Sequence, residues 1–281
     1  MIRVVLGTLL FTIACGRDAM PRTGTARIVS QVVFADEELW HLGPEVHPRV
    51  VGVSPMADDA RYSDAVGLWA SSLARPVGAE AIAALTPDLV ITAEFTAAET
   101  RAALQQIGIR TLELAGWNGF DDYRRHVGEI ADALDVEAAG TRSVAEFDAE
   151  LARLRERFAG EPHPGVVSWQ EGAVAGAGTS FADAAAAAGF VDVAASNGIV
   201  GHTTIGVETL VAWDPEYIVV SCEDDCTARE REIAARPGIA ATRAAKQGGI
   251  VAIQAHHLYS VGAGMLEVVR QLGARRPEHS P

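Results

Sequence analysis

The chain has 281 residues, of which 49% are hydrophobic, so it is long enough to bury one large core or two smaller ones. Its formal net charge is −14, and Lys246 is its only lysine among 23 basic residues. Such an acidic chain repels phosphate backbones, which argues against nucleic-acid binding.

The first 26 residues are predicted to be an export signal with a lipid anchor and a short tether. A single basic residue precedes an apolar run of about ten residues, Val4–Ile13, and then Ala14 and Cys15, as in secretory signals. This run is shorter than the roughly 20 apolar residues of a transmembrane helix. A cysteine after a small residue resembles the bacterial lipoprotein signal, with Cys15 as the lipidated residue. We therefore expect a lipid-anchored periplasmic or cell-surface protein; the alternative is a buried first strand over Val4–Thr12.

From residue 27 onward, short runs of β-branched residues alternate with alanine-rich helical segments. This alternation is typical of α/β units with parallel strands. Each half has few strands, so we expect two Rossmann-like α/β lobes with parallel sheets, at residues 27–140 and 161–281. The predicted strands are Ile28–Phe34, Val50–Val53, Leu89–Thr92, Arg110–Leu114, Gly165–Trp169, Tyr217–Ser221 and Gly249–Gln254. The predicted helices are Asp36–Leu42, Glu80–Leu85, Thr96–Gln106, Phe120–Leu134, Ser180–Ala187, Thr209–Ala212, Arg229–Ala235 and Ala263–Leu272.

Residues 141–160 are predicted to form a single long helix that joins the two lobes. Apolar residues recur there at steps of three and four, which makes one stripe on a helix, and Gly160 with Pro162 ends the pattern. At about 1.5 Å per residue, a helix over Thr141–Ala159 is roughly 28 Å long, enough to bridge two lobes. The stripe consists of Val144, Phe147, Leu151, Leu154 and Phe158.

One stretch of the sequence occurs twice, half a chain apart. GAEAIAALTPDLVI covers Gly78–Ile91 and GVETLVAWDPEYIV covers Gly206–Val219, so Glu80 matches Glu208 at an offset of 208 − 80 = 128 residues. Each copy is typical of a short helix that proline ends and a buried strand follows. A glutamate in the first turn of such a helix is favoured by the helix dipole. The repeat supports two lobes of similar construction.

The cysteines Cys222 and Cys226 enclose the sequence CEDDC. In an exported protein, two cysteines this close are expected to form a local disulfide. A metal site is the alternative, but it requires more soft ligands than two sulfur atoms, and the residues between them are mostly carboxylates. We therefore predict a disulfide and no metal here.

Aromatic and acidic residues follow several predicted strands at their carboxyl ends, where parallel α/β sheets bind ligands. Aromatic faces with a few polar tips suit a bulky, partly apolar ligand, and arginine is scarce there, Arg61 being the nearest. Adjacent His256 and His257 would face opposite sides of a strand, which is poor geometry for one metal unless they lie in a loop. The alternative for half of the aromatic residues is packing within their own lobe. The predicted contacts from strand ends are Phe34, Glu94, Phe95, Trp117, Trp169, Glu223, His257 and Tyr259.

With these features the chain resembles the solute-binding proteins of bacterial ABC importers, in the class that carries cobalamin, ferric siderophores or haem. The resemblance covers residues 27–272. It implies two lobes joined by one long helix, a ligand cleft between the lobes, and only a small opening and closing movement. Its most specific segments are PVGAEAIAALTPDLVI, AGAGTSFADAAAAAGF, GVETLVAWDPEYIVV and PGIAATRAAKQGGIVAI.

The resemblance also implies roles for single residues. Glu80 and Glu208 are expected to dock on basic pockets of the membrane permease, which works with an ATPase, and two carboxylates on one rim would orient the protein over a two-fold partner. Tyr62 and His202 fall where relatives have aromatic residues that face the ligand. The protein is expected to be a monomer with no catalytic residue and no cofactor of its own. The chain departs from the family after the first strand, where Phe34 to Glu37 replace a Ser/Pro-rich turn.

The expected ligand is a metal chelate that contains cobalt or iron. Aromatic walls with few arginines favour a corrinoid, followed by a ferric siderophore and then by haem, with Tyr62 and His202 as axial ligands. Two other hypotheses remain. A secreted α/β enzyme would use a carboxylate pair such as Glu94 and Glu171. A free-metal receptor would use His202, His256 and glutamates.

Overall fold

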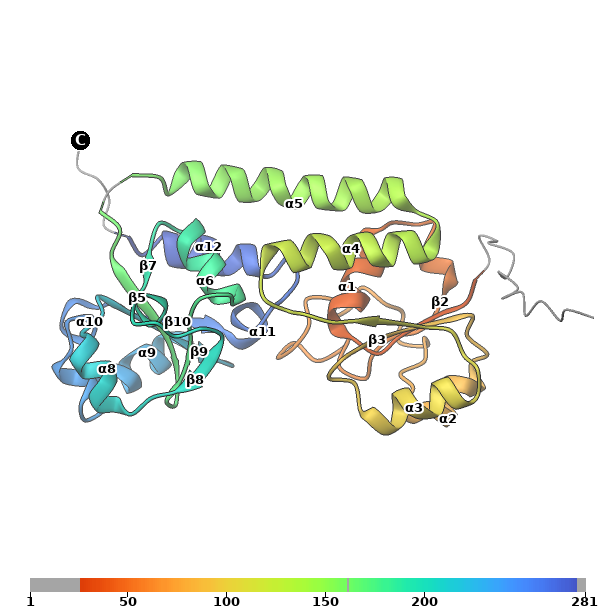
Figure 1. The fold of residues 1–281 in the computed structure, drawn as a ribbon, viewed down its shortest axis with the longest axis horizontal. Helices are drawn as coiled ribbons and strands as arrows, with labels where there is room; N and C mark the ends of the chain where they lie inside the picture. Colours follow the sequence, from red (N-terminus) through yellow and green to blue (C-terminus); the bar gives the residue numbers. More distant parts are fainter. Residues whose placement is uncertain (1–25, 161, 277–281) are drawn as a thin grey trace, which may run out of the picture.

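The computed structural model describes residues 26–160 and 162–276, and it has two α/β lobes beneath a long helix (Figure 1). The first lobe contains a parallel sheet of four strands in the order β2-β1-β3-β4. All five residues of β3 are buried, as expected for a strand between two others in a parallel sheet. The strands are β1 (Ile28–Ser30), β2 (Val50–Gly52), β3 (Leu89–Ala93) and β4 (Thr111–Leu114). The helices are α1 (Val33–His41), α2 (Gly78–Ala84), α3 (Ala98–Gln106) and α4 (Phe120–Leu134), with a 3-10 turn at His47–Arg49.

The second lobe contains a mixed sheet in the order β10-β9-β5-β6-β8, and β7 pairs with β5. The three strands β10, β9 and β5 are parallel, whereas β6 and β8 add an antiparallel extension. The strands are β5 (Gly165–Gln170), β6 (Ala173–Ala175), β7 (Val191–Asp192), β8 (His202–Thr204), β9 (Tyr217–Cys222) and β10 (Ile250–Gln254). The helices are α6 (Ser180–Ala187), α7 (Val193–Ser196), α8 (Val207–Trp213), α9 (Cys226–Ala234), α10 (Arg243–Gln247), α11 (Ala255–Leu258) and α12 (Met265–Gly273), with a 3-10 turn at Ile239–Ala241.

Helix α5 (Glu137–Arg157) runs above both lobes and joins them (Figure 1). Its Phe147 is buried and stacks on Tyr123 of α4, with 4.2 Å between ring centroids. About one turn further along, Glu150 accepts a charged hydrogen bond of 2.9 Å from Arg270 of α12, in the second lobe. The connecting helix is therefore packed against both lobes, and it begins four residues before the predicted start.

A second link between the lobes lies at the start of α4. The Oδ2 atom of Asp183, on α6, accepts a hydrogen bond of 3.0 Å from the backbone N–H of Phe120. A carboxylate at a helix N-terminus satisfies a backbone donor and opposes the positive end of the helix dipole. The second lobe thus supplies the charge that caps a helix of the first.

The repeated stretch forms the same two elements in each lobe, α2 with β3 and α8 with β9. Both short helices lie on the side of the molecule opposite α5 (Figure 1), and Glu80 and Glu208 are exposed in their first turns. The sequence repeat is therefore also a structural repeat.

In the described residues 26–160 and 162–276, no helix has both the length and the apolar character needed to cross a membrane. The predicted signal and the lipidation site at Cys15 lie outside these residues.

Candidate ligand-binding cleft

Two cavities meet where the lobes face each other. We name them the aromatic cavity, of about 280 Å³, and the acidic cavity, of about 730 Å³. They share Arg61 and Tyr62 from the first lobe and Ala255 and Tyr259 from the second. Because they share these four residues, the two cavities form one continuous cleft between the lobes.

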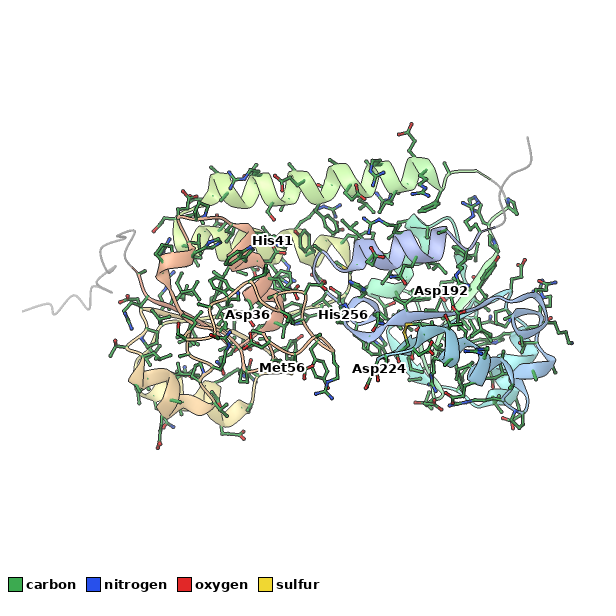
Figure 2. The ribbon with its side chains drawn as sticks, turned by 180° about the vertical axis from the view of Figure 1, so that it is seen from behind. Asp36, His41, Met56, Asp192, Asp224 and His256 are labelled. Carbon is green, nitrogen blue, oxygen red and sulfur yellow. A yellow bond between two sulfur atoms is a disulfide. The ribbon has the colours of Figure 1, made fainter. Side chains whose placement is uncertain are left out.

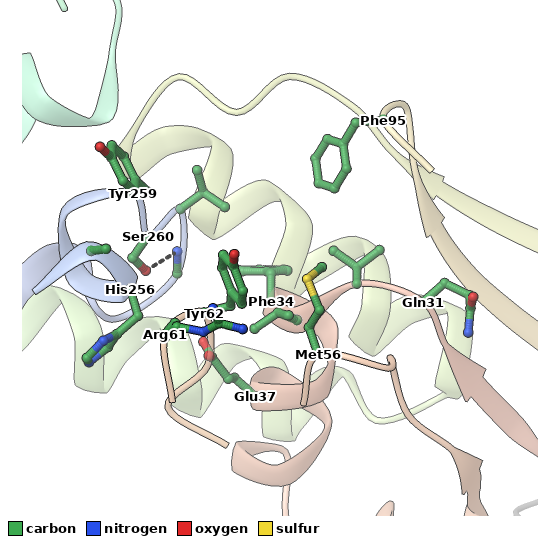
Figure 3. A pocket seen from close by; sticks show the side chains of 15 residues that line it. Gln31, Phe34, Glu37, Met56, Arg61, Tyr62, Phe95, His256, Tyr259 and Ser260 are labelled. Carbon is green, nitrogen blue, oxygen red and sulfur yellow. Dashed lines mark hydrogen bonds between the residues drawn. The ribbon is translucent and has the colours of Figure 1, made fainter. Parts of the chain in front are cut away.

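The aromatic cavity is lined by large apolar side chains that stay exposed to solvent (Figure 3). Phe95 is 65% exposed, Tyr259 57%, Tyr62 52% and Met56 46%. Soluble proteins seldom leave such a group of large apolar side chains in contact with water unless a ligand or partner covers it. Phe34 forms a buried part of the wall. This cavity suits a flat, largely apolar ligand.

The two tyrosines that face the cleft from opposite lobes differ in their hydrogen bonds. Tyr259 donates from its hydroxyl to the Oγ atom of Ser221, at 3.0 Å. Within the described residues, the hydroxyl of Tyr62 has no hydrogen-bond partner, and the guanidinium of Arg61 lies 5.3 Å from the centre of its ring. Tyr62 is therefore the phenol that is available to a ligand.

The acidic cavity lies next to the disulfide between Cys222 and Cys226, whose Cα atoms are 5.2 Å apart. Its wall includes Glu223, Asp224 and Asp225, and Asp225 caps α9 by accepting from the backbone N–H of Ala228. These carboxylates favour a ligand with donor groups or positive charge at this end of the cleft.

Helix α1 carries three consecutive buried acids, Asp36, Glu37 and Glu38. Burial raises the pKa of Asp36 to about 6, that of Glu37 to about 8 and that of Glu38 to about 7. Asp36 accepts from the backbone N–H of Ser54, and Glu38 accepts from the hydroxyl of Ser143 on α5. These two carboxyl groups therefore tie α1 to its neighbours.

Glu37 has a different position, because it lines the aromatic cavity (Figure 3). Its Oε1 atom accepts a hydrogen bond of 2.9 Å from the backbone N–H of Asp64. With a pKa of about 8, its carboxyl group is mostly protonated at neutral pH, so it also presents a hydrogen-bond donor.

We expect Glu37 to make folding stability depend on pH. Its folded pKa of about 8 lies above its ordinary value of 4.5, so the stability from the protonated form is complete below pH 4.5 and is lost as the pH rises through 8. In the wild type, Glu37 should lower the free energy of unfolding by about 3 kcal/mol between pH 5 and pH 8. The variant Glu37→Gln has no titrating group at this position and should lack this decrease. Urea unfolding across this range measures the decrease. Glu146→Gln, at an exposed site on α5, is the control, and equal pH dependence in both variants would contradict the expectation.

Five of the predicted ligand contacts lie on the cleft. Phe34, Tyr62, Phe95 and Tyr259 line the aromatic cavity, and Glu223 lines the acidic one. Phe34 reaches it from the first turn of α1 rather than from a strand end, because β1 stops at Ser30 and the helix begins at Val33.

The other predicted contacts lie outside both cavities. Trp117 packs behind Phe95 and against His126, with ring centroids 5.4 and 4.2 Å apart, so it supports the wall without forming it. Trp169 is 6% exposed and belongs to the core of the second lobe. These two tryptophans are thus used for packing, unlike Phe95.

The remaining polar candidates are directed elsewhere. Glu94 accepts from the backbone N–H of Gly116, and His202 is exposed on β8 at the edge of the second sheet. His257 points its Nε2 atom at Asp64, while its neighbour His256 borders the aromatic cavity. Glu171, the proposed partner of Glu94 in an enzyme, is bound to two arginines of the second lobe and borders neither cavity.

Sequence reasoning missed Met56, Glu37 and Ser260 as wall residues. Met56 lies in an irregular loop and Ser260 follows a four-residue helix, so neither has a periodic pattern that would place it. Glu37 was expected in the helix from Asp36, but Phe34 was assigned to the strand before it, so their helical spacing of three residues, which puts both on one face, was not recognised.

A family model for periplasmic binding proteins matches residues 36–256, whereas no curated protein matches the sequence. The periplasmic haem-binding protein RhuT from Roseiflexus is 27% identical, with a TM-score of 0.73 over 89% of this chain and 97% of that one. A periplasmic haem-binding protein from Pseudomonas aeruginosa is 25% identical, with a TM-score of 0.71 over 89% of this chain and 91% of that one.

A possible iron-binding periplasmic protein from Staphylococcus epidermidis has a TM-score of 0.78 at 17% identity, over 90% of this chain and 98% of that one, which shows a shared fold. Proteins of this family are periplasmic and deliver small molecules to ABC permeases. The two lobes, the joining helix and the cleft agree with a family model that spans most of the chain, and the chain therefore belongs to the periplasmic binding protein family.

Proposed function

We propose that this protein captures haem in the cleft between its lobes and delivers it to an ABC permease. The observation that carries the proposal is the hydroxyl of Tyr62, which among the described residues has no partner and stands at the edge of an apolar, aromatic cavity. A tyrosine oxygen is a known axial ligand of haem iron. Phe34, Phe95 and Met56 would contact the faces of the macrocycle.

The similarity to two haem-binding proteins at 25% and 27% identity supports haem over the corrinoid and siderophore that the sequence favoured. In this proposal His202 does not contact the ligand, because it lies on β8 away from the cleft. Tyr259 is instead the residue of the second lobe that contacts the ligand. Arg61 would offer its charge to a haem carboxylate, in exchange with Asp59, which it now binds at 2.6 Å.

Delivery in this proposal uses Glu80 and Glu208 as contacts with the permease, one from each lobe. Both are exposed, and their helices α2 and α8 lie on the same side of the molecule (Figure 1), which would suit a two-fold partner that meets both lobes at once. The protein would act as a monomer, held to the membrane through lipid on Cys15. Residues 27–140 and 161–281 would be its lobes, and residues 141–160 the connecting segment, most of which lies in α5.

A titration of the purified protein with haemin, cyanocobalamin and a ferric siderophore tests the ligand. We expect one haemin per protein, with an absorption spectrum of tyrosine-ligated ferric haem, and no change with the other two. Saturable binding of cyanocobalamin or the siderophore, without haemin binding, would overturn the choice of haem and keep the cleft as the site. Binding of none of the three would overturn the proposal.

A further inference from the structure

Three metal-binding side chains meet at the junction of the lobes, beside the cleft. Asp64 belongs to the irregular loop before α2, whereas His256 and His257 belong to α11 in the second lobe. Figure 2 shows His256 between the two lobes. Its ring points away from Phe34 and Phe95, so it is free to face Asp64 rather than a ligand in the aromatic cavity (Figure 3).

The two histidines lie close to the same oxygen atom, Oδ1 of Asp64. The Nε2 atom of His256 lies 3.4 Å from Oδ1 of Asp64, and the Nε2 atom of His257 lies 3.5 Å from it. Nitrogen–oxygen hydrogen bonds in proteins are shorter, at about 2.7–3.2 Å. Tetrahedral zinc with bonds of about 2.0–2.1 Å holds its ligand atoms about 3.3–3.4 Å apart. Both separations therefore match edges of a metal coordination shell, and all three ligand atoms lie within 4.8 Å of one another.

The short helix makes this arrangement possible. Successive residues of a helix are about 100° apart, whereas those of a strand face opposite sides. On α11 the two imidazole rings accordingly lie side by side, with centroids 4.0 Å apart. A strand would have placed the two rings on opposite faces.

The third ligand, Asp64, belongs to the first lobe and is positioned there by Glu37. Glu37 accepts a hydrogen bond of 2.9 Å from the backbone N–H of Asp64, which positions the loop that carries the carboxylate. The site is also open to solvent, because the side chains of His256, His257 and Asp64 are 17%, 21% and 45% exposed. An ion could enter without unfolding.

We propose that Asp64, His256 and His257 bind a divalent transition-metal ion of the zinc class. Two imidazole nitrogens and one carboxylate oxygen suit zinc, cobalt, nickel and copper, and three protein ligands leave a position for water. The ion ties the two lobes together. Asp64 is two residues from Tyr62 and His257 is two residues from Tyr259, so metal binding also sets the separation of the tyrosines across the cleft.

Titration of the purified, tag-free protein with Co²⁺ tests the site, because Co²⁺ absorbs visible light with an intensity that depends on its coordination. We expect one Co²⁺ per protein, displaced by Zn²⁺, and a rise in Tm with Zn²⁺ alone. Asp64→Asn and the double variant His256→Gln/His257→Gln should each lose at least about 10-fold in affinity. His202→Gln, which removes an exposed histidine on β8, is the matched control and should bind as the wild type does.

Titration of the wild-type protein tests the metal site even if a variant fails to fold. Circular dichroism identifies a variant that does not fold. Absence of a visible Co²⁺ spectrum in the wild type would overturn the proposal. So would unchanged Co²⁺ affinity in folded Asp64→Asn and in the double variant. The haemin titration measures haem binding separately. The outcome of the Co²⁺ titration therefore neither supports nor contradicts the haem proposal.

Discussion

Tyr62→Phe is expected to lower the affinity for haemin by at least about 100-fold, or about 2.8 kcal/mol. The substitution keeps the aromatic ring in the wall of the cavity and removes only the oxygen that we assign to the iron. Equilibrium titration followed by visible absorption measures the loss. The spectrum should also change, because the iron of any haem that still binds would have a different ligand.

The matched control is Tyr259→Phe, in the same cleft but from the opposite lobe. Its hydroxyl already donates to Ser221 in the protein without ligand, so this hydrogen bond contributes about 0.5–1.5 kcal/mol to folding, and its loss should lower haemin affinity far less than Tyr62→Phe does. If Tyr62→Phe binds haemin as the wild type does, Tyr62 is not the iron ligand. If Tyr259→Phe has the larger effect and alters the spectrum, the two tyrosines have the opposite roles.

Reversal of both charges, Glu80→Arg with Glu208→Arg, should reduce ligand uptake by about 100-fold or more while ligand binding stays normal. Each glutamate is exposed in the first turn of a short helix, and the two helices lie on one side of the molecule. Reversed charges facing basic pockets would repel the permease from both lobes. Each single reversal should cost about 10-fold, because the two sites are far apart and act independently.

Uptake by cells that contain the cognate permease measures this effect, with haemin titration as the control for the cleft. Glu137→Arg is the matched control variant, since it reverses an exposed first-turn acid on α5, on the opposite side of the molecule. If the double reversal and Glu137→Arg transport equally well, the two glutamates belong only to the structural repeat.

Regular elements of the fold were predictable because their side chains follow a periodic pattern. The bounds of α4 and α6 agree with the prediction residue for residue, and Phe147 and Leu151 of the connecting helix are buried as its apolar stripe requires. The start of α5 was placed late because its apolar stripe begins only at Val144. The turn before it includes Asp135, a non-glycine residue with φ at +58° that no motif indicates.

The cleft was only partly predictable, because its walls come from segments without periodicity. Tyr62 was found through the family resemblance, and Phe95 through its place after a strand. Trp169 has the same sequence signal as Phe95, yet it packs in the core, because position at a strand end does not decide which face a side chain takes. The arrangement of His256 and His257 was hard to predict for a related reason, since the helix α11 begins immediately after β10 and brings the two rings side by side.

The most direct measurement of the central claim is a crystal structure of the protein with haemin. We expect the macrocycle between the lobes, in contact with Phe34 and Phe95, with its iron bonded to the Tyr62 oxygen. Haem bound on an outer face, or bound in the cleft with its iron far from Tyr62, would contradict the proposed role of this tyrosine. An empty cleft in crystals grown with excess haemin would contradict haem as the ligand.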